Sequence, residues 1–254
     1  MSKLPNILLP DNVFSVLFAS VLPDNVKERI KFTASSVISN EIETGNADIG
    51  IIPSCDLIKH QNLFVSNKLA FSFDGQLSGS YLYFVPGQNN FTDLYLTGDA
   101  NSNDVILSKI VFNERYSSQI QIHLANEIDS GKNYLVAGDK NFENGKFSRG
   151  LSFADELSTM LFLPYVNFVL VSKNESSLSS MNKLFEGIDE RIESSSNEVI
   201  NKLQFDTASK DFINENLNSL YYEMTENETD ALTELIRLPY YHGITEELFD
   251  LRFV

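Results

Sequence analysis

Residues 6–22 read NILLPDNVFSVLFASVL, and this stretch decides the fold class. The apolar run at 6–9 is typical of a buried strand, and the Pro-Asp-Asn turn at 10–12 supplies a residue that can cap a helix. From 13 to 22 the apolar side chains recur on one helical face. A strand followed directly by an amphipathic helix begins a βαβ unit, so this stretch predicts an α/β fold.

The same alternation continues outward along the chain. Further strands are expected at 30–33, 47–52, 81–85, 94–96, 120–124, 134–139 and 166–171, and helices at 36–44, 103–116 and 151–162. After 172 the pattern indicates almost only helix, with a candidate linker at 174–180. The Thr-Glu-Asn-Glu run at 225–228 has the spacing of a helix capping box.

This order of elements predicts two lobes. A βαβ half is followed by a second αβ unit and then by helices that must return to cover the first sheet. The chain should therefore cross near Gly79 and near Ser172. The first lobe would comprise 1–79 plus 173–254, and the second 80–172, with a helical C-terminal region. Small molecules bind such folds in the cleft at the carboxyl ends of the strands.

The charge balance restricts the partners that the chain can have. The 254 residues carry a formal net charge of −16, and 173–254 contain 17 acidic and 7 basic residues. A surface this acidic repels phosphate backbones and anionic lipids, so neither nucleic acid nor a membrane is an expected partner. The excess is expected on a solvated helical surface. No secretory leader or membrane-spanning stretch is recognisable, which predicts a soluble cytoplasmic protein.

Familiar catalytic and metal-binding motifs are missing from the sequence. It has no glycine-rich phosphate loop, no nucleophile elbow and no zinc-protease motif. His60, His123 and His242 lack metal-ligand spacing, so neither a metal nor another cofactor is expected. The single cysteine, Cys55, excludes an intramolecular disulfide, and it is better explained as a half-buried small residue than as a nucleophile.

Polar residues at strand ends are the remaining signal. Asn12 follows the first strand, Ser54 follows the strand at 47–52, and Asp139 ends another. Polar residues also surround the first crossing at 72–78. Those at 99–103 precede a helix whose N–H groups could hold a carboxylate. Any one of them is commonly a cap or turn residue, so the prediction rests on their joint placement around one cleft.

Several short motifs resemble, in order, those of the chorismate dehydratases of the futalosine route to menaquinone. The resemblance rests on LPDN at 9–12, ETGNADIGIIPS at 43–54, NERY at 113–116, LVAGDK at 135–140, LPYV at 163–166, HGI at 242–244 and LRFV at 251–254. It runs over essentially the whole chain. It implies a type-II periplasmic-binding-protein-like fold without export.

The resemblance also implies a reaction and a site. The family removes water from chorismate to give 3-[(1-carboxyvinyl)oxy]benzoate, without a metal or redox cofactor. Asn12 would be the catalytic position, as an orienting group, with the substrate's own carboxylate as the hypothetical base. We predict substrate contacts from Ser54, Ser72, Asp74, Gly75, Ser78, Asn101, Ser102, Asn103 and Asp139.

Four positions depart from the family pattern. Asn103-Asp104 stands where the family has Thr-Ser, Gly79 where it has serine, and Leu157 where tryptophan is common. An aspartate within a few ångströms of a bound carboxylate would cost about 1–4 kcal/mol. Two alternatives therefore stay open. One is a sister enzyme of the same pathway that relies on a catalytic histidine. The other is a non-catalytic protein that binds a neutral or cationic small molecule in the cleft. The sequence leaves the oligomeric state open.

Overall fold

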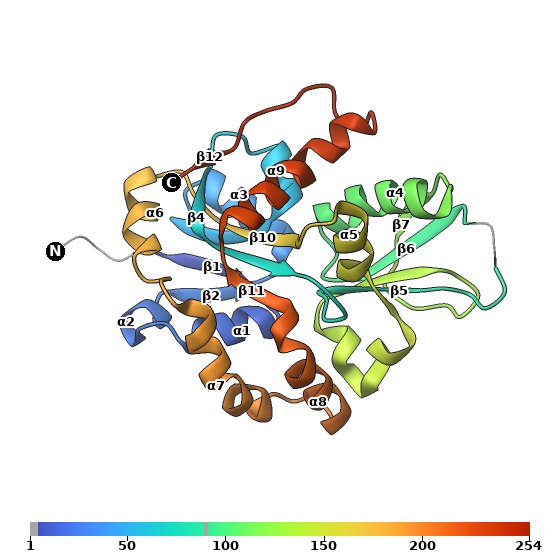
Figure 1. Cartoon of the computed structure of the whole chain (residues 1–254), viewed down its shortest axis with the longest axis horizontal. Helices are drawn as coiled ribbons and strands as arrows, with labels where there is room; N and C mark the ends of the chain where they lie inside the picture. The colour runs from blue at the N-terminus through green and yellow to red at the C-terminus, as the bar shows by residue number, and fades with distance from the viewer. Residues whose placement is uncertain (1–4, 89–90) are drawn as a thin grey trace.

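The computed structural model describes residues 5–88 and 91–254, which form two lobes, each built on its own β-sheet (Figure 1). The larger sheet has the order β11-β4-β10-β3-β1-β2, with β12 also beside β4. Its strands are β1 (Ile7–Pro10), β2 (Ile30–Thr33), β3 (Ile49–Pro53), β4 (Phe64–Phe73), β10 (Tyr165–Ser172), β11 (Leu220–Glu223) and β12 (Arg252–Phe253). The α/β, two-lobed prediction is confirmed.

The smaller sheet has the order β7-β6-β8-β5-β9. Its strands are β5 (Ser80–Tyr83), β6 (Asp93–Gly98), β7 (Gln121–Leu124), β8 (Tyr134–Ala137) and β9 (Leu151–Ser152). The chain passes to this sheet between Phe73 and Ser80, and it returns to the larger sheet at Tyr165. The return is earlier than the predicted crossing near Ser172, because β10 pairs with β3 and β4.

Helices cover both sheets (Figure 1). They are α1 (Val13–Ser20), α2 (Asp24–Lys27), α3 (Ile38–Glu43), α4 (Ser102–Tyr116), α5 (Phe153–Leu161), α6 (Glu175–Asn182), α7 (Ile188–Lys202), α8 (Thr207–Asn216) and α9 (Glu226–Tyr241). Short 3₁₀ segments are η1 (Ser35–Val37), η2 (Ser54–Ile58), η3 (Asp139–Arg149) and η4 (Leu217–Ser219). In the described ranges, no helix is long and apolar enough to cross a membrane. The cytoplasmic location stays a prediction.

The first βαβ unit forms as the sequence predicts. β1 and β2 are parallel, with Ile7 opposite Ile30, and β3 pairs in parallel on the other side of β1. Asn12 caps α1, because its Oδ1 accepts a hydrogen bond from the Ser15 N–H at 2.9 Å. The capping box at Thr225 also forms, at the start of α9. The carboxyl ends of β1 and β3 therefore point toward the smaller lobe.

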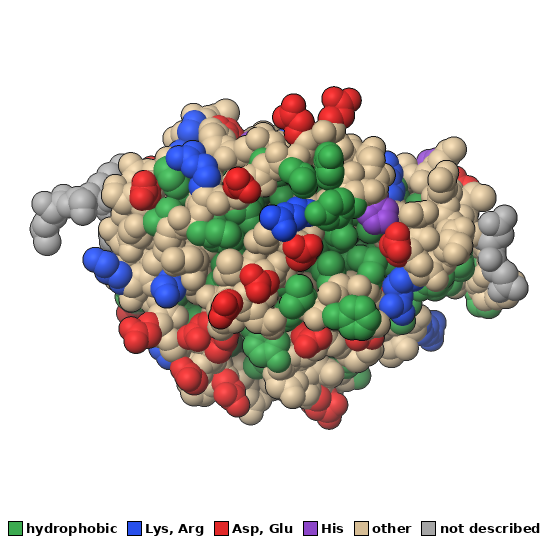
Figure 2. Space-filling view, turned by 45° about the horizontal axis from the view of Figure 1, so that its top comes forward, with side chains coloured by type: hydrophobic (Ala, Val, Ile, Leu, Met, Phe, Trp, Pro, Cys, Tyr) green, Lys and Arg blue, Asp and Glu red, His purple; other side chains and the backbone are tan. Residues whose placement is uncertain are grey.

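The last third is less helical than predicted. β11 and β12 both pair with β4, and the candidate linker at 174–180 lies mostly in α6. The acidic excess does lie in solvent, since Glu186, Glu190 and Glu193 in and before α7 are exposed. Acidic side chains outnumber basic ones on the face shown in Figure 2.

Aromatic packing joins the two lobes. Phe14 of α1 packs edge-on against Phe73 of β4 at 5.0 Å between ring centroids, and against Phe142 of η3 at 6.2 Å. Phe142 in turn meets Tyr81 of β5 at 6.3 Å. The buried core is thus continuous from the larger lobe into the smaller one. Burial of rings of this size contributes on the order of 1.5–3 kcal/mol each.

Candidate functional site

The two lobes meet where the helical segments that follow β1, β2 and β3 begin. The N–H of Val13, in the first turn of α1, donates to Asp139 Oδ1 at 3.1 Å. The N–H of Ser35 donates to both carboxylate oxygens of Asp99, each at 3.1 Å. In both pairs a backbone donor of the larger lobe meets a carboxylate that follows a strand of the smaller sheet.

A third contact of the same kind uses a carboxamide. The N–H of Cys55, in η2, donates to Asn103 Oδ1 at 2.8 Å. Asn103 Nδ2 donates to the carbonyl oxygen and to Oδ1 of Asn167 in β10, at 2.6 and 2.9 Å. We call the three pairs Val13–Asp139, Ser35–Asp99 and Cys55–Asn103 the interlobe clasp. Together they hold the lobes against each other.

The clasp leaves almost no free space in the cleft. A cavity of about 10 Å³ remains, and its lining residues are Asn12, Phe14, Gly79, Ser80, Asp99, Asn101, Ala137, Gly138, Asn167 and Phe168. This is close to the volume of one water-sized sphere, whereas ligand pockets usually measure about 300–1,000 Å³. The two lobes are therefore in contact across the cleft, and the remaining cavity is too small for a ligand in this conformation.

The side-chain amides of Asn12 and Asn167, which line this cavity, have N–H groups without a hydrogen-bond partner among the described residues. Asn12 and Asn167 are 7% and 5% exposed. Asn12 Oδ1 caps α1, and Asn167 Oδ1 accepts from Asn103 and from the Tyr165 hydroxyl. Within residues 5–88 and 91–254, neither Nδ2 group donates a hydrogen bond. Both nitrogens keep some accessible surface, since neither is among the fully buried unpaired atoms of the described residues, and together they place two free donors beside one cavity.

The cleft is acidic. Burial raises the pKa of Asp139 to about 7, opposed by the bond from Val13 and increased by the charges of Asp11, Asp99 and Glu143. Burial also raises the pKa of Asp99. The hydrogen bonds from Ser35 lower this pKa, and the charge of Asp11 raises it further. The lining contains no lysine, arginine or histidine among the residues described. Closure therefore brings together carboxylates that lack a cationic partner.

Asp104 does not line this cavity, although the sequence places it at the start of α4. Its Oδ2 accepts from the Asn101 N–H at 2.9 Å, which completes a capping box, and its Oδ1 accepts from the Ser80 hydroxyl at 2.7 Å. Burial raises its pKa to about 6. The N-terminus of α4, considered above as a carboxylate site, is thus capped by a residue of its own first turn.

Of the other predicted contact residues, only Asn101 is among the residues that line the cavity. Asn103 and Asp139 form the clasp. Two of the predicted hydroxyls donate to backbone carbonyls: Ser54 to Val166 and Ser72 to Tyr221. The Gly75 carbonyl accepts from Ser152, and the Ser78 hydroxyl accepts from the Ala154 N–H. Asp74 is exposed, and the buried Ser102 hydroxyl has no partner in the described chain.

The histidines and the cysteine lie outside the cavity. His123 stacks on Tyr95 and pairs with Asp93 at 2.7 Å, while His60 and His242 pair with glutamates elsewhere. Burial raises the pKa of the Cys55 thiol far above its usual range, so the thiolate nucleophile does not form. Across the described residues, no group of His, Cys, Asp and Glu could hold a metal ion.

Sequence reasoning missed Asn167. The residue lies in an apolar run that correctly predicted a strand, and a buried amide in such a run must find partners. The polar Asn167 within this apolar run is the sequence feature that could have indicated it. Asp99 was noticed at a strand end but was not assigned a contact.

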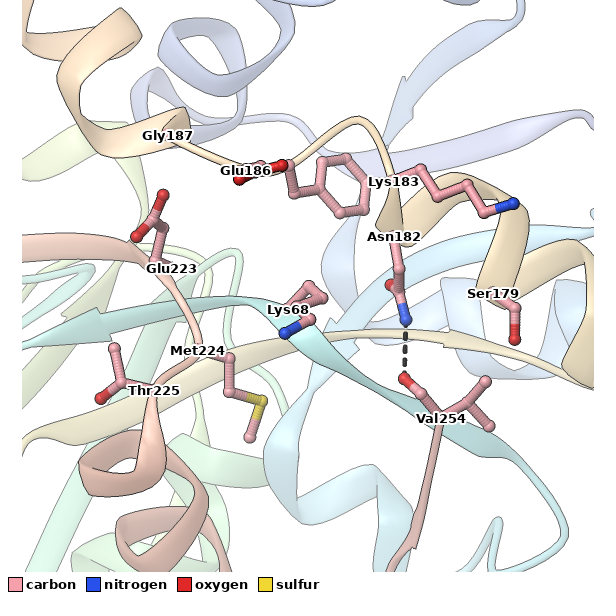
Figure 3. Close-up of a pocket in the computed structure, with 11 residues that line it drawn as sticks. Lys68, Ser179, Asn182, Lys183, Glu186, Gly187, Glu223, Met224, Thr225 and Val254 are labelled. Carbon is pink, nitrogen blue, oxygen red and sulfur yellow. Dashed lines mark hydrogen bonds between the residues drawn. The ribbon is translucent and has the colours of Figure 1, made fainter.

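A larger cavity of about 750 Å³ lies away from the cleft, beside the edge of β4 that pairs with β12 at one end and with β11 at the other. Figure 3 shows Lys68 with Glu223 and Met224 on one side and Val254 on the other. Asn182 bridges this seam, since its Nδ2 donates to the Val254 oxygen and its Oδ1 accepts from Ser66. These contacts join the last strand to the larger sheet.

Comparisons with known proteins show the fold. Neither a protein-family model nor a curated protein sequence matches the chain. Protein AF1704 from Archaeoglobus fulgidus is similar in structure, with a TM-score of 0.62 and 13% identity over 95% of this chain and 98% of that one.

Two further solved structures are similar at the same level. The CA3427 gene product of Candida albicans, described as having the generic periplasmic binding protein fold, has a TM-score of 0.62 and 10% identity over 98% of this chain and 93% of its own. The alkanesulfonate-binding protein SsuA of Xanthomonas axonopodis pv. citri, bound to MOPS, has a TM-score of 0.62 and 9% identity over 96% and 95%. The chain therefore has the periplasmic-binding-protein-like fold.

Proposed function

We propose that this protein binds a small molecule in the cleft between its lobes, and that the ligand enters when the interlobe clasp opens. The observation that carries the proposal is the pair of unpaired carboxamide donors, Asn12 and Asn167, beside one closed cavity. SsuA shares the fold and binds alkanesulfonates. This likeness supports a binding role for the fold, not a particular ligand.

The hydrogen bonds of the clasp set the free-energy cost of opening the cleft. Each of its bonds joins a backbone N–H to a side chain, and the net contribution of such a bond is about 0.5–1.5 kcal/mol, or up to about 3 kcal/mol with an ionised acceptor. Breaking the bonds exposes the N–H groups of Val13, Ser35 and Cys55 to the cleft. A ligand that pairs with them replaces the lost bonds, so its binding energy can offset opening.

A second candidate function is chorismate dehydration. The observation that favours it is Asp139, a carboxyl with a pKa of about 7 whose Oδ1 accepts from the residue next to Asn12. A general base works best when its pKa is near the working pH, so Asp139 could take the ring proton while Asn12 orients the substrate. The acidic lining opposes this candidate, because two substrate carboxylates would lie beside Asp99 and Asp139.

Thermal-shift screening of a metabolite library, with chorismate included, tests the binding proposal. A true ligand at 100 times its Kd should stabilise the protein by about 2.7 kcal/mol. The shift should disappear in the double variant Asn12→Ala/Asn167→Ala and persist in Asn113→Ala, whose carboxamide faces His242 on the surface. If no compound stabilises the protein, or if every hit survives the double variant, the cleft is not a ligand site.

The enzyme candidate has its own readout. Chorismate is incubated with the protein, and its ultraviolet spectrum is followed as 3-[(1-carboxyvinyl)oxy]benzoate forms. Asp139→Asn should reduce the rate by a factor of about 10²–10⁴, the usual contribution of a general base. Chorismate that stabilises the protein but is never consumed would remove the enzyme candidate and leave the binding proposal intact.

A further inference from the structure

We infer that the ligand of the cleft is a small zwitterion, with an oxyanion that faces Asn12 and Asn167 and an ammonium group that faces Asp99 and Asp139. This inference rests on the proposed binding function and adds the chemical class of the ligand. It also assigns Asn167, at the crossing of the two lobes, as a binding residue.

The larger lobe contributes hydrogen-bond donors to the cleft. The Nδ2 groups of Asn12 and Asn167 are unpaired within the described part of the chain, and both residues are more than nine-tenths buried. The Val13 N–H, in the first turn of the eight-residue helix α1, becomes free when the clasp opens. Three donors close to one cavity are complementary to a carboxylate, which has about four acceptor positions.

The smaller lobe contributes charged hydrogen-bond acceptors to the cleft. Asp99 accepts two hydrogen bonds and Asp139 accepts one, all from backbone N–H groups of the larger lobe. These partners are lost when the lobes separate. Because no cationic side chain lines the cavity among the residues described, a positive group has to come from the ligand or from solution.

A molecule with only one charge satisfies only one side of the cleft. A simple carboxylate pairs with the asparagines but lies beside Asp99, which repels it. A simple amine pairs with Asp99 but leaves the two carboxamide donors unpaired. A molecule with a carboxylate and an ammonium group pairs with the asparagines and with the aspartates at the same time. The lobes can therefore close on it.

Gly79 leaves room for the Asn167 side-chain amide. A Cβ at this position would lie 2.9 Å from Asn167 Nδ2, closer than such atoms approach. The resemblance places a serine of the chorismate dehydratases at Gly79. The space that this serine would need is occupied here by the Asn167 carboxamide. The glycine at position 79 therefore permits the Asn167 side chain to occupy this space.

Calorimetry with chain-matched probes tests the inference. The probes are the ω-amino acids glycine, β-alanine, γ-aminobutyrate and ε-aminocaproate, each compared with the carboxylate and the amine of the same chain length. For γ-aminobutyrate the matched compounds are butyrate and butylamine. At least one amino acid should bind about tenfold or more tightly than both of its singly charged analogues.

Shape-conserving variants separate the two ends of the ligand. Asn12→Asp keeps a good helix cap but replaces the donor with a carboxylate oxygen, so it should weaken binding of the amino acid and of the carboxylate, but not of the amine. Asp99→Asn should reduce the preference for the amino acid over the carboxylate. Asp93→Asn, on the smaller lobe beside His123 and outside the cavity, is the matched control and should leave the ranking unchanged.

The outcomes distinguish the inference from the function on which it rests. If butyrate or butylamine binds as tightly as the amino acid, or if the library yields only singly charged ligands that require Asn12 and Asn167, the zwitterion inference is wrong and the binding function stands. If neither the probes nor the library bind, both proposals fail.

Discussion

At the scale of single residues, Asn103 makes the densest set of contacts between the lobes. Its carboxamide accepts from the Cys55 N–H and donates twice to Asn167. The residue is 1% exposed, so no water can replace these bonds without rearrangement. Asn103 stands where the resembling family has a threonine, and its role here is to join η2 and β10 to α4.

Replacing Asn103 should therefore destabilise the fold. We expect Asn103→Ala to lower the free energy of unfolding by roughly 2–4 kcal/mol, because it removes three hydrogen bonds and leaves the Cys55 N–H buried without an acceptor. The exposed Asn201, whose side-chain amide donates to Asn197 in the same helix, provides the control. Asn201→Ala should change stability by less than about 0.5 kcal/mol in urea denaturation. Equal effects would contradict this account.

Site residues that follow a strand were predictable from the sequence, and Asn167 was not. Asn12 and Asn101 occupy turn positions, where polar residues at strand ends signal a cleft. Asn167 lies inside a strand, where periodicity predicts only burial. Its role depends on which residue faces it across the lobes, and the sequence does not contain that pairing in any local pattern.

At the scale of elements, β4 shows why a central strand escaped prediction. Its residues 64–73 read FVSNKLAFSF, and the polar SNK segment interrupts the apolar pattern. The pairing with β10 jumps from Val169–Ala70 to Val171–Val65, so this segment bulges out of the ladder. The Ser66 hydroxyl stabilises the bulge by accepting from the N–H groups of Lys68 and Leu69. Pattern rules assume an unbroken ladder, which a bulge violates.

The end of α5 carries a conformational cost that one substitution should remove. Phe162, the C-cap, has φ +55° and is 90% exposed. A left-handed conformation costs a non-glycine residue about 1–2 kcal/mol. Because little burial is lost, Phe162→Gly should raise the free energy of unfolding by about 0.5–1 kcal/mol.

Phe162→Ala distinguishes relief of this strain from removal of an exposed ring. Alanine has a Cβ and keeps the steric cost, so this variant should show no comparable gain. Thermal or urea unfolding of the two variants beside the parent protein measures the difference. A gain of equal size in both variants would mean that the backbone conformation at Phe162 is not its source.

At the scale of the whole molecule, closure of the lobes should depend on pH. Asp139 has an ordinary pKa near 3.8 in water and a pKa of about 7 in the closed form, and burial is the main cause. The closed form therefore binds a proton more tightly than the open or unfolded form. Its extra stability is complete below about pH 4 and is lost as the pH rises through about 7.

The expected result is a free energy of unfolding that is higher at pH 5 than at pH 8. At about 1.4 kcal/mol per pKa unit, Asp139 contributes at most roughly 3 kcal/mol between these two pH values, and Asp104, with a pKa of about 6, adds to the same trend. Asp139→Asn should remove much of this dependence, since asparagine can still accept from the Val13 N–H. Urea titrations across this pH range measure it. Stability that rises with pH in the parent protein would contradict the sign.

The pairing of β4 has a consequence for how the chain is made. Ser72 bonds to Tyr221, a residue 149 positions further along, and the Asn67 N–H bonds to Val254. The smaller sheet, in contrast, is complete within residues 80–152. Contacts between distant residues form late because their loops are costly to close. During synthesis the smaller lobe can thus fold first. The longest strand meanwhile keeps an open edge until β11 and β12 have been synthesised, and an unpaired edge is a site where other chains can pair.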